Sequence, residues 1–292
     1  MRYREIKVKG ILNHLSGEDE WFGLKYNLNL YRGCEHQCIY CDTRSHCYQI
    51  ENFNEEVLIK MNALELLEDA LPRKRQIGLI GFGSMNDPYT YAEERYRITE
   101  RALKMIAKYR YPVHIITKSD MVLKDLAILQ DINRVKTRVS FTITTADDLL
   151  AKKLEPGAPS PSRRLAAMRV LSENGIETGV VMMPVLPFIE DSPEKITRIV
   201  LTAKDHGADY IIPSFGMTMR EGQREHYYQK LDEHFPGLRA KYEAAFGDAY
   251  HCPARNQDKL AHLFYKLCTT NHIDTRVTAY PPKPDLQQLR LL

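Results

Sequence analysis

The sequence predicts an α/β protein built on a parallel sheet with crossover helices. Extended, β-branched runs alternate with amphipathic helical stretches from about residue 28 to residue 215, the alternation expected of parallel strands joined by helices. Two helix starts are marked by Ser160-Pro161 and Ser192-Pro193, where a capping hydroxyl precedes a proline at the first helical position. Such a sheet can stay flat or curl into an incomplete barrel.

Six strands are expected, each a short run rich in β-branched or aromatic residues. In chain order, they are Asn29 to Tyr31, Ile77 to Phe82, Val113 to Thr117, Val139 to Thr144, Thr178 to Met183 and Tyr210 to Pro213. In a flat parallel sheet and in a barrel alike, active sites lie at the carboxyl ends of the strands. We therefore expect the functional residues in the segments that follow the strands.

The helical segments show apolar residues on one face. One carries Ile98, Ala102, Met105 and Ile106 at helical spacing, and another stops at Gly207. These stripes predict helices that cover the outer face of the sheet.

The chain is interpreted as a single domain over residues 1–292. Residues 1–24 form an N-terminal extension, residues 25–215 form the core, and residues 216–292 form a mostly helical C-terminal cap. We expect this cap to cover an open end of the barrel.

The composition indicates a protein with a sizeable core and no membrane segment. Of the 292 residues, 43% are hydrophobic and 27% are charged, and no apolar run approaches the length of a bilayer span. The segment Met1 to Lys7 has no apolar stretch that could serve as a signal peptide. The expected location is the cytoplasm, where thiols stay reduced.

The charge balance neither requires nor excludes nucleic acid. There are 41 basic and 38 acidic residues, a net charge of +3, well below that of a dedicated phosphate-backbone binder. The short basic groups Arg73-Lys74-Arg75 and Arg163-Arg164 are interpreted as solvated surface.

Three of the six cysteines, Cys34, Cys38 and Cys41, share one short loop after the first predicted strand. A structural zinc ion would need a fourth ligand, and only His36, His46, Cys47 or a distant residue could supply it. A 4Fe–4S cluster held by three thiolates would instead keep one iron without a protein ligand. That open iron could bind the amino and carboxylate groups of S-adenosylmethionine (SAM), whose sulfonium suits a negatively charged cluster.

This loop resembles that of the radical SAM superfamily, and the resemblance narrows to its spore photoproduct lyase-like branch. The motifs that carry it are Arg32-Gly33-Cys34-x-His36-x-Cys38-x-Tyr40-Cys41, Ile116-Thr117-Lys118, Phe141-Thr142-Ile143, Leu154-Glu155-Pro156-Gly157 and Met183-Pro184. They run in family order over residues 25–215, about two thirds of the chain. The resemblance implies a partial (β/α)6 TIM-type barrel.

The resemblance also implies roles for individual residues. The three loop cysteines would be the cluster ligands, and Tyr40 would pack against the adenine of SAM, although it could also be a core aromatic. The other cofactor-binding candidates are Gly83, Ser84 and Met85 at the methionyl amino group, Lys118 at the methionyl carboxylate, Thr142 beside it, and Glu155 at the ribose. Glu155 could alternatively pair with Arg163 at a helix start.

The chain departs from the lyase pattern at one catalytic position. Ser84 stands where the lyase has a cysteine that returns a hydrogen atom to the substrate radical. Because an O–H bond is much stronger than an S–H bond, this serine puts thymine-dimer repair in doubt. Ser84 and Tyr89 are the catalytic candidates of this segment, and the other conceivable donors are Tyr91, Cys47, Cys252 and Cys268. Each of these three cysteines could equally be a small core residue.

The leading hypothesis is therefore an enzyme that cleaves SAM reductively to a 5′-deoxyadenosyl radical and abstracts hydrogen from an organic substrate. The alternatives are repair of a DNA lesion and, in another class, a zinc-stabilised binding module. The expected partners are a small-molecule or nucleic-acid substrate and an electron donor such as flavodoxin or ferredoxin, with no membrane.

Overall fold

The computed structural model describes residues 1–16, 19–50, 53, 55–277 and 280. The main sheet of this described part has seven strands in the order β10-β9-β8-β7-β6-β3-β2. Six of them run parallel in chain order: β3 (Tyr26–Leu28), β6 (Ile80–Phe82), β7 (Val113–Thr117), β8 (Thr137–Thr142), β9 (Glu177–Met182) and β10 (Tyr210–Pro213). Sequential parallel strands joined by crossovers give the partial TIM-type barrel that the sequence predicted.

The predicted strand bounds hold at two strands and move by a few residues at three others. Val113–Thr117 and Tyr210–Pro213 are observed as predicted, whereas β6, β8 and β9 are shifted or shortened at their ends. The prediction is wrong for the first strand, because β3 spans Tyr26–Leu28 and Tyr31 belongs to a different sheet. Every second residue from Tyr26 to Leu30 is buried, so the apolar pattern alone does not fix where this strand ends.

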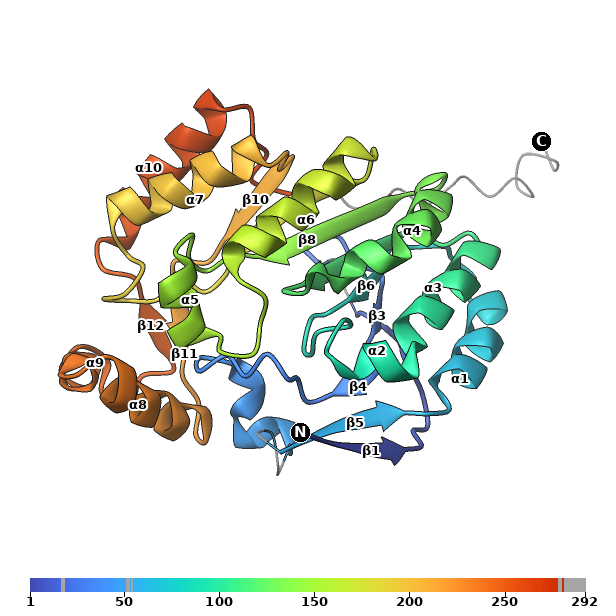
Figure 1. Ribbon diagram of the computed structural model, residues 1–292, viewed down its shortest axis with the longest axis horizontal. Coiled ribbons are helices and arrows are strands. Elements are labelled where there is room, and N and C mark those ends of the chain that lie inside the picture. The colour runs from blue at the N-terminus through green and yellow to red at the C-terminus, as the bar shows by residue number, and fades with distance from the viewer. Residues whose placement is uncertain (17–18, 51–52, 54, 278–279, 281–292) are drawn as a thin grey trace.

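Helices cover the outer face of the barrel in chain order (Figure 1). They include α1 (Ala63–Ala70), α3 (Ile98–Lys108), α4 (Leu126–Asn133), α6 (Pro161–Glu173) and α7 (Pro193–Asp205), with the shorter α2 (Ala92–Tyr96) and α5 (Asp148–Leu154) between them. The predicted caps are confirmed, since the Ser160 and Ser192 side chains accept from the backbone N–H groups of Arg163 and Lys195. Among the described residues, no helix is long and apolar enough to cross a bilayer.

The N-terminal extension contributes one strand to the main sheet and one to a separate three-stranded sheet. β1 (Arg2–Ile6) pairs in parallel with β5 (Glu56–Lys60), which pairs antiparallel with β4 (Tyr31–Arg32). β2 (Leu12–His14) lies antiparallel to β3 at the edge of the main sheet. The segment before residue 25 is therefore part of the folded unit around the barrel.

The described residues after β10 form three helices and two short strands, and the sequence did not reveal these strands. The helices are α8 (Gln223–His234), α9 (Leu238–Phe246) and α10 (Gln257–Thr270). β11 (Gly216–Thr218) pairs antiparallel with β12 (His251–Pro253), next to α8 and α9 (Figure 1). Three-residue strands carry too little alternation to be recognised in a sequence. We call β11 and β12 the tail strands.

A polar layer crosses the interior of the barrel. Side chains at alternate strand positions point inward, and here they include His114, Ser140 and Tyr210. The Ser140 hydroxyl lies 2.7 Å from Nε2 of His114 and 2.6 Å from the Tyr210 hydroxyl. Gly179 is needed beside them, because a Cβ there would lie 2.3 Å from the Tyr210 ring.

His114 should make the fold sensitive to mild acid. Burial, with help from the charge of Arg138, lowers its pKa from 6.5 to about 3, so below pH 6.5 the unfolded chain takes up a proton that the folded chain refuses. Stability attributable to His114 is complete above pH 6.5 and should fall by about 2 kcal/mol by pH 5. Urea unfolding of the apoprotein at pH 7 and pH 5 should show a smaller loss for His114→Gln than for the wild type. Equal losses in the two proteins would contradict this prediction.

Candidate active site

The cysteine loop, residues 33–41, lies at the carboxyl ends of the strands and is held by hydrogen bonds from two other segments. The Gly33 N–H donates to Asn86 Oδ1 at 3.0 Å, in the loop after β6. The Ile39 N–H donates to the Leu154 carbonyl at 2.9 Å, and the Gly157 N–H donates to the His36 carbonyl at 3.0 Å. The Leu154–Gly157 motif therefore binds the cysteine loop through two backbone hydrogen bonds.

The three loop thiols differ in their electrostatic environments. Burial raises the pKa of the Cys38 thiol, and the Lys118 ammonium opposes that shift. At Cys34 burial acts in the same direction, but the neighbouring His36 outweighs it and lowers the pKa. The Cys41 sulfur lies 2.8 Å from the Thr43 hydroxyl. Positive groups that favour thiolates therefore flank the loop.

This donor set fits a cluster better than a single ion. A structural zinc ion draws four ligands to one point, with Zn–S bonds of about 2.3 Å, and this loop supplies three thiols. Three thiols on one loop, each free of a disulfide, suit a 4Fe–4S cube in which each thiolate binds a different iron.

Tyr40, just before the third cysteine, is fixed by a buried charge pair. Its hydroxyl donates to Glu155 Oε1, which also accepts from the Thr144 hydroxyl at 2.9 Å. The other Glu155 oxygen lies 2.5 Å from the Arg164 guanidinium, and both of these charged side chains are fully buried. Although burial opposes it, Arg164 lowers the pKa of Glu155 to about 2. Glu155 thus binds Tyr40, Thr144 and Arg164 within the protein.

Two predictions about neighbouring arginines are wrong. Glu155 pairs with Arg164, whereas Arg163 pairs with Asp120 at 2.7 Å on the surface. Arg164 was also expected to be solvated, but it faces inward and donates to the Thr142 and Pro159 carbonyls. The helix start at Pro161 contains the missed signal, since it places Arg164 on the same face as the buried Met168 and Leu171.

Lys118 follows β7 and reaches the same group of residues. Its Nζ lies 5.9 Å from the centroid of the Tyr40 ring, and its backbone N–H donates to Asp87 Oδ2 at 2.7 Å. Asp87 also accepts from the Thr117 hydroxyl at 2.6 Å and lies 3.3 Å from His36 Nδ1. Asp87 therefore joins the ends of β6 and β7 to the cysteine loop.

Only some of the site residues predicted in the segment after β6 lie near the cysteine loop. Gly83 has a φ of +85°, and a Cβ there would lie 1.9 Å from the Ile116 carbonyl, so the neighbouring strand already requires glycine. Ser84 exchanges hydrogen bonds with the Asn27 amide at 2.9 and 3.1 Å. Tyr89 is not brought to the site: it is fully buried in the core, and its hydroxyl donates to Asp125 at 3.0 Å.

Of the other residues that could donate a hydrogen atom, two are buried and two are exposed. Cys252 and Cys268 are fully buried in separate hydrophobic clusters, as small core residues are. Cys47 and Tyr91 are exposed, and Arg220 donates to the Cys47 sulfur at 3.1 Å.

A pocket of about 410 Å³ opens where the cysteine loop, the segment after β6 and the tail strands meet. Its lining includes Tyr40 and Cys41 from the loop, Ser84 and Met85 from the segment, and Thr218 and His251 from the tail strands. Lys118 and Glu155 contact Tyr40 beside the pocket. Arg164, which pairs with Glu155, donates to the Thr142 carbonyl. The tail strands thus form part of the lining of this pocket.

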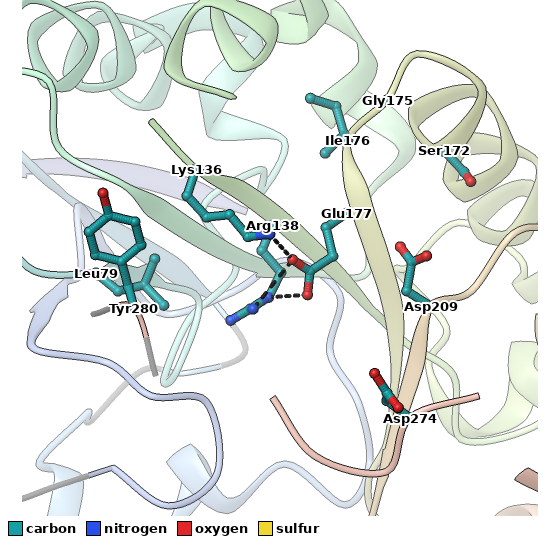
Figure 2. Close-up of a pocket in the computed structure, with 10 residues that line it drawn as sticks. All are labelled: Leu79, Lys136, Arg138, Ser172, Gly175, Ile176, Glu177, Asp209, Asp274 and Tyr280. Atoms are coloured by element: carbon teal, nitrogen blue, oxygen red, sulfur yellow. Dashed lines mark hydrogen bonds and ion pairs between the residues drawn. The ribbon is translucent and has the colours of Figure 1, made fainter. Parts of the chain in front are cut away.

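A larger cavity, about 700 Å³, lies at the opposite end of the strands (Figure 2). Glu177 pairs with both Lys136 and Arg138, and Asp209 and Asp274 also line the cavity. It lies around the first residues of β8 to β10 and shares no lining residue with the pocket at the cysteine loop. Placement at the amino ends of barrel strands is typical of structural rather than catalytic residues.

Gly157→Ala should loosen the support of the cysteine loop. A Cβ at this position would lie 2.0 Å from the Glu35 carbonyl, so the two backbones must separate and the bond to the His36 carbonyl is lost. We expect a loss of about 1–3 kcal/mol in the free energy of unfolding, and faster release of iron to a chelator. Gly10→Ala is the control, because no atom lies within 4 Å of a Cβ there. Equal behaviour of the two variants would contradict the prediction.

The fold and the site together define an enzyme with a cofactor pocket at the carboxyl ends of a partial barrel. The chain belongs to the radical SAM superfamily, whose family model matches residues 28–200. Enzymes of this family use a 4Fe–4S cluster and SAM, and these are the cofactors of this chain. The zinc-stabilised binding module has no support from this comparison.

Relatives and solved structures agree with this assignment. The chain is 27% identical over 267 residues to an uncharacterized protein of Mycobacterium tuberculosis, covering 88% of this chain and 77% of the relative. It is 30% identical over 221 residues to an uncharacterized protein of Acidianus two-tailed virus, covering 70% of each. Spore photoproduct lyase complexed with dinucleoside spore photoproduct superposes with a TM-score of 0.71 over 94% of this chain and 81% of the lyase chain, at 16% identity. At that identity the superposition shows the shared fold alone.

Proposed function

We propose that this enzyme holds its cluster through Cys34, Cys38 and Cys41 and binds SAM in the pocket of about 410 Å³ beside them. The chemistry supplied there is reductive cleavage of SAM to a 5′-deoxyadenosyl radical, which takes a hydrogen atom from an organic substrate. The observation that carries the proposal is the pocket itself, because residues next to the third cysteine, residues after β6 and tail-strand residues face one another across it.

The chain's own residues would bind and orient SAM. Tyr40 would present its ring to the adenine, since Glu155 holds its hydroxyl and leaves the ring in the pocket wall. Lys118 would pair with the methionyl carboxylate, because its side chain is half-buried and needs an anionic partner. Met85 and the backbone after Gly83 would line the methionyl side, and Thr142 would act beside Lys118.

The tail strands would bind the substrate and limit the entry of water. Thr218 and His251 contribute polar groups to the pocket lining from the tail strands, whereas Ser84 and Met85 come from the segment after β6. Met217 adds an apolar surface. A pocket closed by the protein would protect a radical from solvent. We propose an organic substrate with both apolar and hydrogen-bonding groups.

Repair of a DNA lesion is the second candidate, supported by the fold shared with spore photoproduct lyase. Two features weigh against it. Ser84 replaces the expected hydrogen-donor cysteine, and Arg73-Lys74-Arg75 precedes β6, at the end of the sheet away from the pocket. A lesion substrate would predict DNA affinity that weakens steeply with salt.

We further propose that the enzyme works in the cytoplasm with a flavodoxin-like or ferredoxin-like electron donor. The support is chemical: a cluster on thiolates needs reduced cysteines, and all six cysteines are free thiols.

The test is anaerobic reconstitution with iron and sulfide, followed by dithionite and SAM. We expect a brown protein that releases 5′-deoxyadenosine. An intact cluster without any release of 5′-deoxyadenosine would overturn the proposal.

A further inference from the structure

Gln223 is a buried amide at the first position of α8, and it contacts the cysteine loop from the C-terminal part of the chain. Only 1% of its surface is exposed. Its Nε2 donates to the Tyr40 carbonyl at 2.9 Å and to the Thr218 carbonyl at 2.9 Å, while its Oε1 accepts from the Arg220 N–H at 2.9 Å. Both donors and one acceptor lone pair of the amide therefore bind backbone groups.

The position of these contacts matters because they surround the third cysteine. The Tyr40 carbonyl belongs to the peptide bond that leads into Cys41, so its direction helps to set where the Cys41 side chain points. On the other side of Cys41, the Thr218 hydroxyl donates to Asp42 Oδ1 at 3.3 Å. β11 thus reaches the residues on both sides of Cys41, once through Gln223 and once through Thr218.

The start of α8 is itself fixed against the segment after the cysteine loop. The His46 N–H donates to the Glu221 carbonyl at 3.2 Å, and a Cβ on Gly222 would lie 2.5 Å from the His46 ring. Gln223 is therefore held in place before any ligand binds, as a residue that positions another group must be.

We infer that Gln223 is a positioning residue that couples the substrate side of the pocket, formed by the tail strands, to the orientation of Tyr40 and Cys41 at the cofactors. This inference rests on the proposed function. The Gln223 amide donates to the Thr218 carbonyl and also to the Tyr40 carbonyl. A ligand that contacts Thr218 therefore acts on a residue that is bonded to the same amide as Tyr40. A merely structural glutamine would stabilise the fold without changing the environment of the cluster.

The experiment compares Gln223→Met with Glu225→Ala in reconstituted enzyme. Methionine keeps the length of the side chain and removes its hydrogen bonds. Glu225 is exposed and accepts from the Gly222 N–H at 2.5 Å, so its loss weakens the same helix start without touching the cysteine loop. Electron paramagnetic resonance of the reduced cluster with and without SAM, and the SAM concentration for half-maximal 5′-deoxyadenosine release, are the readouts.

Gln223→Met should alter the resonance spectrum of the SAM-bound cluster and raise the half-maximal SAM concentration about tenfold, as expected when the Tyr40 carbonyl loses its buried hydrogen bond. Glu225→Ala should leave both at wild-type values. Wild-type spectra and SAM dependence in Gln223→Met, or equal changes in Glu225→Ala, would overturn the inference. If Gln223→Met does not fold, Gln223→Asn, whose amide is too short to reach both carbonyls, is judged by the same criteria. A wild-type protein with no cluster signal would instead overturn the proposed function, and this inference with it.

Discussion

Replacing Cys34, Cys38 or Cys41 singly with alanine is expected to abolish 5′-deoxyadenosine release. Each thiolate would bind a different iron, so losing one leaves two corners of the cube without a protein ligand and the cluster labile. The measurement is iron and sulfide content after anaerobic reconstitution, together with 5′-deoxyadenosine formed with dithionite and SAM. We expect a colourless protein and product below detection.

The remaining cysteines are the matched controls for this loss. Cys252 and Cys268 are fully buried in the core, and Cys47 is exposed beside Arg220. Cys47→Ala and Cys268→Ser should keep the cluster, although the serine places a hydroxyl in an apolar site and lowers stability. Cluster loss in Cys47→Ala that equals the loss in Cys41→Ala would mean that the ligand set has been assigned wrongly.

The fold was readable from the sequence because parallel strands and their crossover helices leave strong local signals. The serine–proline pairs at 160–161 and 192–193 mark helix starts that the structure reproduces. The order of the six parallel strands also follows from the rule that such crossovers place successive strands side by side. Tyr26–Leu28 was missed as the first strand because its alternation of buried apolar residues continues through Leu30 to Tyr31.

The sequence predicted the site only where its residues lie close together in the chain. The spacing of Cys34, Cys38 and Cys41 could be recognised, but no local pattern indicates that Gln223 lies 183 positions from its partner Tyr40 and contacts its carbonyl. The polar run from Arg220 to Glu225 has the composition of solvated surface. Tertiary folding alone distinguishes the buried glutamine from its exposed neighbours.

Arg164→Met is expected to destabilise the protein more than any other single change to a charged residue near the site. Both Arg164 and Glu155 are fully buried and lie 2.5 Å apart. Removing only the cation leaves an uncompensated carboxylate in the interior, which costs about 3–5 kcal/mol. Urea unfolding of the apoprotein at pH 7 measures the loss. Because Glu155 also holds the Tyr40 hydroxyl, the reconstituted variant should bind SAM more weakly as well.

The adjacent Arg163 supplies the control, since it pairs with Asp120 while its side chain is 65% exposed. Arg163→Met should change the free energy of unfolding by about 1 kcal/mol or less, the usual range for an exposed pair. Adding Glu155→Gln to Arg164→Met should recover part of the lost stability, because the neutral amide removes the stranded charge. Equal losses of stability in Arg163→Met and Arg164→Met would contradict the prediction. So would a double variant that is less stable than the sum of the single changes predicts.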